Sequence, residues 1–499
     1  MFFSTKVSNN KREEADLLVI PFWRQGKKIK IASSIDIDTI DEMEFILASN
    51  DFTAKVGQTC LIYSNEFMEK RILLLGLGEE NKLTQEIVRD TYGKVVKLCL
   101  EKKLATVNCI LPIISELKTL HIDLFLSSLA EGFLSMNYVF PKYGNKKEEV
   151  DFLLERVNIY GIVEKIATPI LSKIESIFEG VFLARDLVNH NADLVTPQYL
   201  AKISQGLAKK FSTLKVTVFD KKMITSENMG LIEAVSKGAA VDPRFIILEY
   251  RGDPRSKDQT VIIGKGVTYD TGGLDLKPGK SMLSMKEDMS GAATVLGVMS
   301  VVASMDLKVN IVGLIPATEN AIGSKSYKNG DVYIGLSGDS VEIGSTDAEG
   351  RLILADAIAY AVKKLKPSRI IDFATLTGAI TIALGNRCAG LFSNNDNLAE
   401  ALYEAGNITG EEVWRLPLCE SYKEDISSDI ADIKNIGKGY AGSITAALFL
   451  EHFVKNIAWA HLDIAGTAYQ DEARNYLPKY ASGFGVRLMY AYIERYLLS

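Results

Sequence analysis

Short apolar runs alternate with longer amphipathic segments along the first third of the chain. Apolar runs of four to eight residues between turn residues are typical of strands, whereas apolar positions three and four apart indicate helices. The pattern predicts strands at 16–22, 71–75, 106–113 and 157–162, and helices at 85–101 and 123–136. The polar run at 142–151 predicts an exposed loop.

The same alternation continues through the rest of the chain. A helical pattern at about 171–189 joins the two parts, and Pro197 fits the first turn of the next helix. Further strands are predicted at 216–219, 245–250, 260–267, 308–316, 369–373, 390–393 and 461–464, and a long helical pattern opens near Asp288 and runs to about Met305. Strands joined by helical crossovers indicate an α/β protein.

The length of 499 residues exceeds what one hydrophobic core normally supports, so two domains are predicted. We expect an N-terminal α/β domain over 1–167. We expect a second domain over 168–499, built on a central mixed, mostly parallel sheet flanked by helices.

Composition narrows the class of protein. The chain is 47% hydrophobic and 24% charged, which is typical of a globular protein. A net charge of −6 argues against nucleic acid or an anionic membrane as a partner. The five cysteines form no C-x-x-C pair, which favours free thiols in a reducing compartment. With neither a signal peptide nor a transmembrane run in the sequence, a cytoplasmic location is predicted.

A first group of candidate functional residues lies in the segment TDAEGRL at 346–352. In an extended chain, alternate residues share a face, so Asp347, Glu349 and Arg351 are predicted to point the same way. A divalent metal between the two carboxylates would remove their repulsion, and Arg351 could hold an anion beside it. Taken alone, this segment is better explained by a solvated strand edge.

A second group of charged residues follows the apolar run at 260–263. Lys265, Asp270 and Lys277 come from a glycine-rich segment that lets the backbone turn sharply, and Asp288 stands eleven residues beyond Lys277. Strand ends, loops and helix starts are the places where α/β sheets gather functional groups. The two groups together therefore predict one site.

These segments carry a resemblance to a known family. GKGVTYDTGGLDLKPGKSMLSMKEDMSGAA at 264–293 and STDAEGRL at 345–352 resemble the leucyl aminopeptidases, also called cytosol aminopeptidases. DFATLTGA at 372–379, the region 429–442 and WAHLDIAG at 459–466 extend the likeness over roughly 180–490. The resemblance implies a metal-dependent aminopeptidase that removes leucine-like N-terminal residues from short peptides, using a water activated by two metals.

The resemblance also implies a ligand set. Lys265, Asp270, Asp288 and Glu349 would hold one divalent ion, and Asp270, Asp347 and Glu349 the other. Mn²⁺ or Zn²⁺ is expected, and Mg²⁺ or Co²⁺ also suits such ligands. As a ligand, Lys265 must be neutral, which costs roughly 4–5 kcal/mol when its pKa falls from about 10.4 to below 7.

Further roles follow from the same resemblance. Lys277 and Arg351 are the catalytic pair: Lys277 would stabilise the oxyanion, and Arg351 would hold a bicarbonate that moves protons. The wall of the substrate pocket would comprise Met285, Thr375, Leu376 and Gly378, although core packing explains these positions too. Family members are typically homohexamers, built as a dimer of trimers, that act on peptides with a free N-terminus.

Other interpretations of the sequence have weaker support. The P-loop-like segment at 273–281 has five residues between its glycines where four are required, and 75–81 lacks the third glycine of a dinucleotide fingerprint. The four histidines show no ligand spacing. An inactive or nucleic-acid-binding scaffold on the same fold remains the alternative. Ser345 departs from the family, which usually has asparagine there, and its effect stays open.

Overall fold

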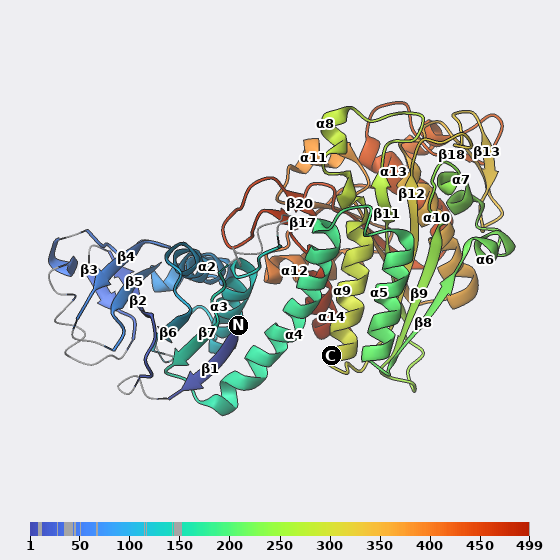
Figure 1. Ribbon diagram of the computed structural model, residues 1–499. Coiled ribbons are helices and arrows are strands. Elements are labelled where there is room, and N and C mark those ends of the chain that lie inside the picture. The colour runs from blue at the N-terminus through green and yellow to red at the C-terminus, as the bar shows by residue number, and fades with distance from the viewer. Residues whose placement is uncertain are drawn as a thin grey trace. The chain divides into compact units, whose positions relative to one another are not determined.

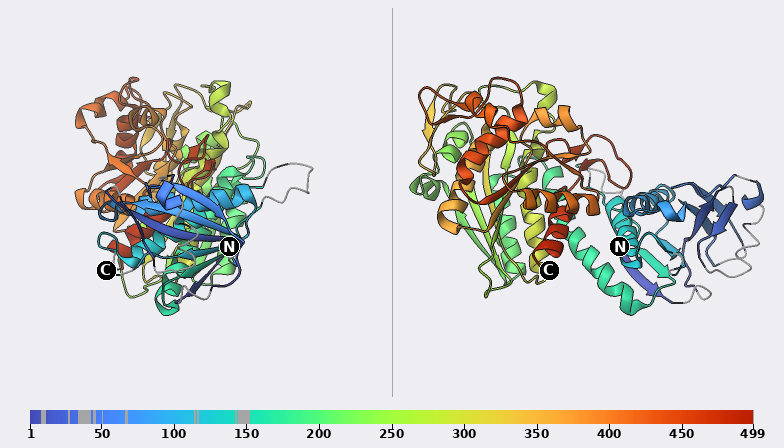
Figure 2. Two further views of the ribbon diagram at one scale, coloured as in Figure 1. Left: turned by 90° about the vertical axis from the view of Figure 1, so that its left-hand side faces the viewer. Right: turned by 180° about the vertical axis from the view of Figure 1, so that it is seen from behind.

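The computed structural model describes residues 1–7, 12–26, 28–33, 43, 46–49, 51–65, 68–113, 115, 117–141, 143 and 152–498. They form two compact units (Figures 1 and 2). The first comprises Met1–Phe178 with Glu472–Pro478, and the second Glu179–Asp471 with Lys479–Ser499. Apart from Tyr143, the loop predicted at 142–151 lies outside the described residues.

The first unit is built on a seven-stranded sheet in the order β1-β7-β6-β2-β5-β4, with β3 paired to β2. Its strands are β1 (Phe2–Lys6), β2 (Leu17–Gln25), β3 (Lys28–Ile31), β4 (Thr59–Tyr63), β5 (Arg71–Gly78), β6 (Thr106–Ile110) and β7 (Arg156–Tyr160). Its helices are η1 (Glu80–Lys82), α2 (Gln85–Lys102) and α3 (Ile122–Met136). Sequence reasoning missed β1, β3 and β4, which are short and contain no fully buried residue.

The second unit contains a nine-stranded mixed sheet in the order β17-β16-β19-β15-β10-β12-β9-β8, with β11 paired to β12. Its strands are β8 (Leu214–Phe219), β9 (Arg244–Arg251), β10 (Thr260–Gly264), β11 (Gly266–Asp270), β12 (Asn310–Asn320), β15 (Arg369–Ala374), β16 (Ala389–Ser393), β17 (Val413–Arg415) and β19 (Ala458–Asp463). The central pairs are parallel, whereas β9 and β16 run antiparallel to their neighbours β12 and β19. The predicted mixed, mostly parallel sheet is confirmed.

Two smaller sheets complete this unit: β13 (Val332–Ile334), β14 (Ser340–Glu342) and β18 (Ile433–Lys434) in one, and β20 (Tyr469–Gln470) and β21 (Tyr480–Ala481) in the other. The helices are α4 (Glu164–Asn189), shared with the first unit, α5 (Pro197–Lys210), α6 (Lys221–Ser226), α7 (Gly230–Ser236), α8 (Gly279–Met282), η3 (Met285–Met289), α9 (Ser290–Ser304), α10 (Glu349–Tyr360), η4 (Ala361–Leu365), α11 (Gly378–Leu384), α12 (Asp396–Thr409), η5 (Glu420–Ile426), α13 (Gly442–Val454) and α14 (Val486–Tyr496). None of the helices in the described residues has the length and apolar character needed to cross a membrane.

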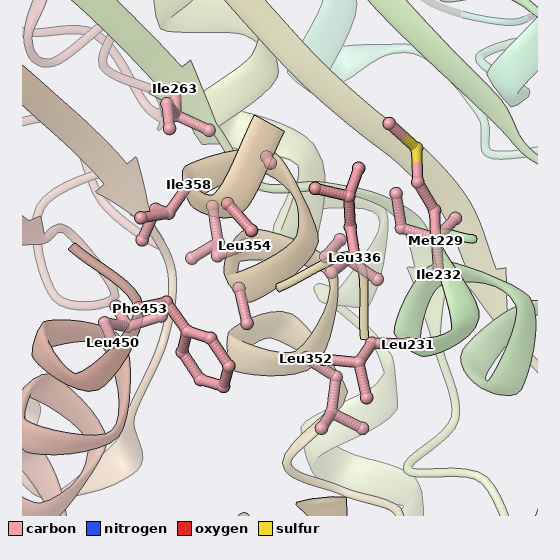
Figure 3. Packing of buried hydrophobic residues seen from close by; sticks show 14 of the residues in the cluster. Met229, Leu231, Ile232, Ile263, Leu336, Leu352, Leu354, Ile358, Leu450 and Phe453 are labelled. Atoms are coloured by element: carbon pink, nitrogen blue, oxygen red, sulfur yellow. The ribbon is translucent and has the colours of Figure 1, made fainter. Parts of the chain in front are cut away.

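Helices cover both faces of the large sheet (Figure 1). On one face α9 packs against β10, β12 and β15, and on the other α10 packs against β10 and β12. Figure 3 shows Leu354 and Ile358 of α10 within the cluster that also contains Ile263 of β10 and Phe453 of α13. Because β10 is buried on both faces, its sequence is a continuous apolar run.

The single strand predicted at 260–267 is wrong, because the chain breaks it at Lys265 into β10 and β11. The break lies where β10 meets the start of α9. A Cβ on Gly264 would lie 2.2 Å from the Gly291 carbonyl oxygen, so only glycine allows this approach. The Lys265 amide donates to the Phe373 carbonyl at 3.0 Å, which fixes the residue beside the end of β15.

Candidate metal centre

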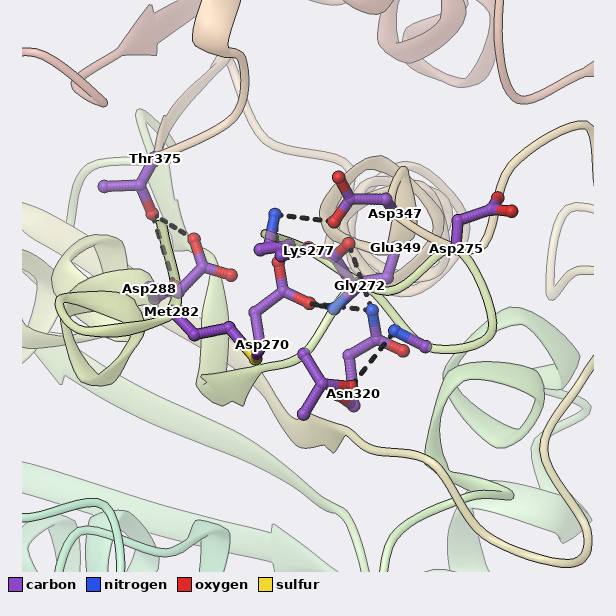
Figure 4. Close-up of polar contacts among 12 residues, drawn as sticks. Asp270, Gly272, Asp275, Lys277, Met282, Asp288, Asn320, Asp347, Glu349 and Thr375 are labelled. Atoms are coloured by element: carbon purple, nitrogen blue, oxygen red, sulfur yellow. Dashed lines mark hydrogen bonds and ion pairs between the residues drawn. The ribbon is translucent and has the colours of Figure 1, made fainter. Parts of the chain in front are cut away.

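The ends of neighbouring strands bring polar side chains to one edge of the large sheet (Figure 4). Lys265 follows β10, Asp270 ends β11, Asn320 ends β12 and Thr375 follows β15. Glu349 enters from the first residue of α10. Parallel strands place their carboxyl ends at a common edge, which is why segments far apart in sequence meet here.

Lys265 lies between two of the predicted carboxylate ligands and is 2% exposed. Its Nζ atom is 2.8 Å from Asp288 Oδ1 and 2.9 Å from Glu349 Oε1. It also donates to the Thr375 carbonyl oxygen at 2.9 Å. A Cβ on Gly350 would lie 2.6 Å from Lys265 Cε, so the glycine leaves the space in which the lysine lies. Lys265 thus joins three segments of the site.

Lys277 makes the second charged bridge. Its Nζ atom is 2.9 Å from Asp270 Oδ2 and 2.5 Å from Asp347 Oδ1. One carboxylate oxygen from each of Asp270, Asp347 and Glu349 lies within 4.8 Å of the others, close enough to share a metal ion. The structure therefore brings all five predicted metal ligands and Lys277 into one cluster.

Asn320 belongs to this cluster, and sequence reasoning missed it because an amide carries no charge to mark it. Its Nδ2 atom donates to Asp270 Oδ1 at 2.8 Å and to the Thr346 carbonyl oxygen at 3.0 Å, and it lies 3.3 Å from Glu349 Oε2. The only available signal was its position at the end of a long apolar strand. Asn320 therefore contacts two of the predicted metal ligands at once and helps to orient them.

Thr375 was predicted as part of a substrate wall, and the structure adds a contact with a predicted ligand. Its hydroxyl donates to Asp288 Oδ1 at 2.7 Å. The other oxygen, Asp288 Oδ2, is buried and has no hydrogen-bond partner among the described residues. A buried carboxylate oxygen without a donor is costly unless a cation binds it.

Burial and mutual repulsion perturb the carboxylates. Burial, with Glu349 nearby, raises the pKa of Asp270 to about 6, and burial raises the pKa of Asp288 well above its usual value. Burial opposes the charge on Lys265, but Asp288 and Glu349 outweigh it and raise the lysine's pKa. Among carboxylates alone Lys265 is therefore a cation, and it can become a neutral ligand only when other cations neutralise them.

The charge balance of the cluster fits divalent cations. Four carboxylates and two lysinium groups leave two negative charges in a site whose members are mostly buried. Carboxylate oxygens with one amine suit Mn²⁺, Zn²⁺, Mg²⁺ and Co²⁺ alike. The residues present fit a centre of divalent ions, and their donor chemistry does not choose among these metals.

The prediction of one extended face at 346–352 is wrong, because α10 begins at Glu349. Arg351 lies in the first turn of the helix and is 7% exposed. Its Nη1 atom donates to the Asn435 carbonyl oxygen at 2.8 Å, while its Nε atom has no partner among the described residues. Burial lowers the pKa of Arg351 to about 10, and Glu349 and Asp463 oppose that shift.

The remaining predicted substrate residues lie on two segments. Met285 begins η3, and Gly378 begins α11. The Leu376 amide donates to Asp463 Oδ1 at 3.1 Å, which anchors the segment after β15. Met285 and Leu376 are partly buried and Gly378 is exposed. Their role in a pocket stays a prediction.

Comparisons with known proteins agree with this geometry. The model of the cytosol aminopeptidase family's catalytic domain matches residues 182–490, and that of its N-terminal domain matches 19–147. A probable cytosol aminopeptidase of Chlamydia abortus is 56% identical over 100% of this chain and 99% of its own length. One from Chlamydia trachomatis serovar A is 53% identical over 99% of both chains.

Solved structures are similar over nearly the whole chain. A tomato leucine aminopeptidase mutant is 30% identical with a TM-score of 0.86, covering 99% of this chain and 96% of its own. The bottromycin maturation enzyme BotP in complex with Mn is 29% identical with a TM-score of 0.85, covering 97% of this chain and 100% of its own.

Proposed function

The chain belongs to the cytosol aminopeptidase family, and from that premise we propose how its own residues carry out the reaction. The protein is a metal-dependent aminopeptidase, a hydrolase that acts on peptides. An inactive scaffold is not favoured, because every predicted ligand is present in the cluster. The observation that carries the proposal is the buried lysine between Asp288 and Glu349.

Two divalent ions, Mn²⁺ or Zn²⁺, are proposed to share the cluster. Lys265, Asp270, Asp288 and Glu349 would hold one ion, and Asp270, Asp347 and Glu349 the other. When bound, the ions would polarise the scissile carbonyl, lower the pKa of the attacking water and hold the free α-amine of the substrate. An internal peptide nitrogen offers no free amine, which restricts cleavage to the N-terminus.

Lys277 is proposed to stabilise the oxyanion that forms on the scissile carbonyl. Its side chain is 17% exposed, which leaves it open to a substrate from solvent. Burial opposes the charge on Lys277, but Asp270 and Glu349 outweigh it and raise its pKa, so Lys277 is a cation in the cluster without metal. Lys277 is proposed to stay charged when metal is bound, and a positive charge suits an oxyanion donor.

Arg351 is proposed to hold a bicarbonate that carries a proton from the attacking water to the leaving amine. Its Nη1 atom is fixed by the Asn435 carbonyl oxygen, which leaves Nε and Nη2 for an anion. The burial of this guanidinium strengthens its attraction for such an anion.

The apolar substrate pocket is proposed to comprise Met285, Thr375, Leu376 and Gly378, which favours leucine-like N-terminal residues. We further propose an N-terminal domain at 1–167 that serves assembly, a catalytic domain at 168–499, a cytoplasmic location, and a homohexamer made of two trimers. An enclosed hexamer would explain restriction to short peptides.

The test compares Asp288→Ala with Asp242→Ala, whose exposed side chain pairs with Lys221 at the surface. Asp288→Ala should lose bound metal and hydrolysis of leucine p-nitroanilide together. Asp242→Ala should keep both, because an exposed ion pair contributes little. Chelation should inactivate the parent protein, and Mn²⁺ or Zn²⁺ should restore it. Full activity of Asp288→Ala would refute the ligand assignment.

A further inference from the structure

Two loops of the second unit carry the groups that meet in the Lys277–Asp347 ion pair. Residues 271–278 connect β11 to α8 and carry Lys277, and residues 343–348 connect β14 to α10 and carry Asp347. The Asp347 side chain is 37% exposed, so core packing does not fix it. Something else must hold the two loops together.

Asp275 joins the loops through its carboxylate. Its Oδ2 atom accepts from the Ser345 hydroxyl at 2.8 Å and from the Thr346 amide at 2.9 Å. Asn329 Nδ2 lies 3.0 Å from Asp275 Oδ1 and braces the carboxylate from a third segment. Hydrogen bonds to a charged acceptor are stronger than neutral ones, so the Asp275 carboxylate holds the two loops together strongly.

Ser345 links the Asp275 carboxylate to the part of the 343–348 loop that carries Asp347. While its hydroxyl donates to Asp275, its Oγ atom accepts from the Asp347 amide at 3.1 Å. A hydroxyl has one proton to give and two lone pairs, so it can satisfy both contacts at once. Ser345 therefore connects the Asp275 carboxylate to the backbone of Asp347.

The loops also meet where the Thr346 hydroxyl contacts the backbone of the loop at 271–278. Asp275 N donates to Thr346 Oγ1 at 2.8 Å, and that hydroxyl donates to the Gly272 carbonyl oxygen at 2.7 Å. Gly273 has a φ of +68°, and a Cβ there would lie 3.0 Å from Thr346 Oγ1. With so little free space, a shift of one loop moves the other.

We propose that Asp275, acting through Ser345, is a positioning residue that holds Lys277 and Asp347 at their working separation. The inference rests on the proposed function, in which Lys277 stabilises the oxyanion and Asp347 binds metal. Asp275 itself is partly exposed and forms hydrogen bonds with the loop at 343–348. Lys277 instead forms ion pairs with Asp270 and Asp347. Ser345, which stands where the family usually has asparagine, has the role of connecting Asp275 to Asp347.

Asp275→Ala tests the proposal, with Asp432→Ala as the matched control. Asp432 Oδ2 also accepts from a serine hydroxyl and an amide, those of Ser340, at 2.6 and 2.8 Å. That contact lies at β14 and does not join the Lys277 loop. Asp275→Ala should lower kcat for leucine p-nitroanilide roughly 10–100-fold, since a misplacement near 1 Å can cost that much. KM should change less than kcat, and Asp275→Asn, which keeps one acceptor oxygen, should recover part of kcat. Asp432→Ala should keep kcat.

A double variant separates positioning from a general structural effect. In a Lys277→Ala background, Asp275→Ala should lower kcat by a smaller factor than in the parent, because the lysine it positions is already gone and only its effect through Asp347 remains. An equal loss in both backgrounds would overturn the proposal.

Hydrogen exchange of the metal-free protein gives a readout independent of activity. Asp275→Ala should speed exchange in peptides covering 271–278 and 343–348 together, whereas Asp432→Ala should leave the first peptide unchanged. Unchanged exchange at 343–348 in Asp275→Ala would also overturn the proposal. If Lys277→Ala instead kept full activity, the proposed function would fail at Lys277, while the exchange result would still decide whether Asp275 ties the loops.

Discussion

Asn320→Leu removes the amide that orients two carboxylates while keeping the size of the side chain. Asn320 is fully buried, so water cannot replace the lost donor. The contact to Asp270 Oδ1, at 2.8 Å, has the length of a strong hydrogen bond, whereas the contact to Glu349 Oε2, at 3.3 Å, is weaker. A hydrogen bond to a charged group contributes about 1.5–3 kcal/mol.

That free energy converts to a change in metal affinity, because the freed carboxylates must be reordered when metal binds. At about 1.4 kcal/mol per tenfold change, one such bond corresponds to roughly a 10–150-fold weaker Kd. This agrees with the loss of about 10–100-fold that follows removal of a residue orienting a metal ligand. Activity at saturating metal should fall much less than affinity.

The assay is calorimetric titration of metal-free protein with Mn²⁺, beside hydrolysis measured over a range of metal concentrations. Asn310→Leu is the matched control, since Asn310 lies at the other end of β12 and its Nδ2 contacts three carbonyl oxygens, those of Asp253, Ser256 and Asp258. It should lose stability but keep the Kd for Mn²⁺. An unchanged Kd in Asn320→Leu would refute the orienting role.

Three further predictions follow. Lys277→Ala should lower kcat roughly 10²–10³-fold with metal content near normal, the usual cost of one oxyanion donor; loss of metal along with activity would make the lysine a structural residue. Burial opposes the charge on His461, but Asp372, 2.6 Å away, outweighs it and raises the pKa of His461. The stability from this pair is complete below the unfolded-state pKa near 6.5 and is lost as pH rises through the raised pKa, so the Tm advantage of the parent over His461→Gln should shrink as pH rises above about 6.5. A Tm difference that stays constant with pH would contradict the raised pKa of His461. Light scattering should give about six times the 54.9 kDa chain mass, and a fully active monomer would remove the hexamer.

The proposed metal ligands were predicted from the resemblance of the motifs that contain them to a known family. Their own positions indicated only that Lys265, Asp270 and Asp288 follow a buried apolar run, where an α/β sheet gathers functional groups. Most strands of the two large sheets were predicted from their apolar runs: a run buried on both faces, such as β10, must be apolar throughout. The short strands β1, β3 and β4 escaped because their partly exposed residues give no such signal.

Local conformation within the site depended on packing that no short segment reveals. The pattern at 346–352 fits an extended strand as well as a helix start, and contacts of α10 with α7 and α13 accompany the helix that begins at Glu349. Likewise, Gly264 and Gly266 allow a turn after the apolar run at 260–263, but the strand was predicted to continue through them to 267. The break at Lys265 follows from the close approach of Gly264 to Gly291 of α9.

The sequence by itself determined which charged groups form the site and which fold class carries them. Only the tertiary structure decided which neutral groups orient those charges. Thr375 meets Asp288 across 87 residues of sequence, Asn320 meets Asp270 across 50, and Ser345 meets Asp275 across 70. A hydroxyl or an amide costs little at the surface, so its presence in the sequence says nothing about a partner. The order and register of the strands bring these groups within hydrogen-bond distance, and that order is set by the packing of the whole sheet.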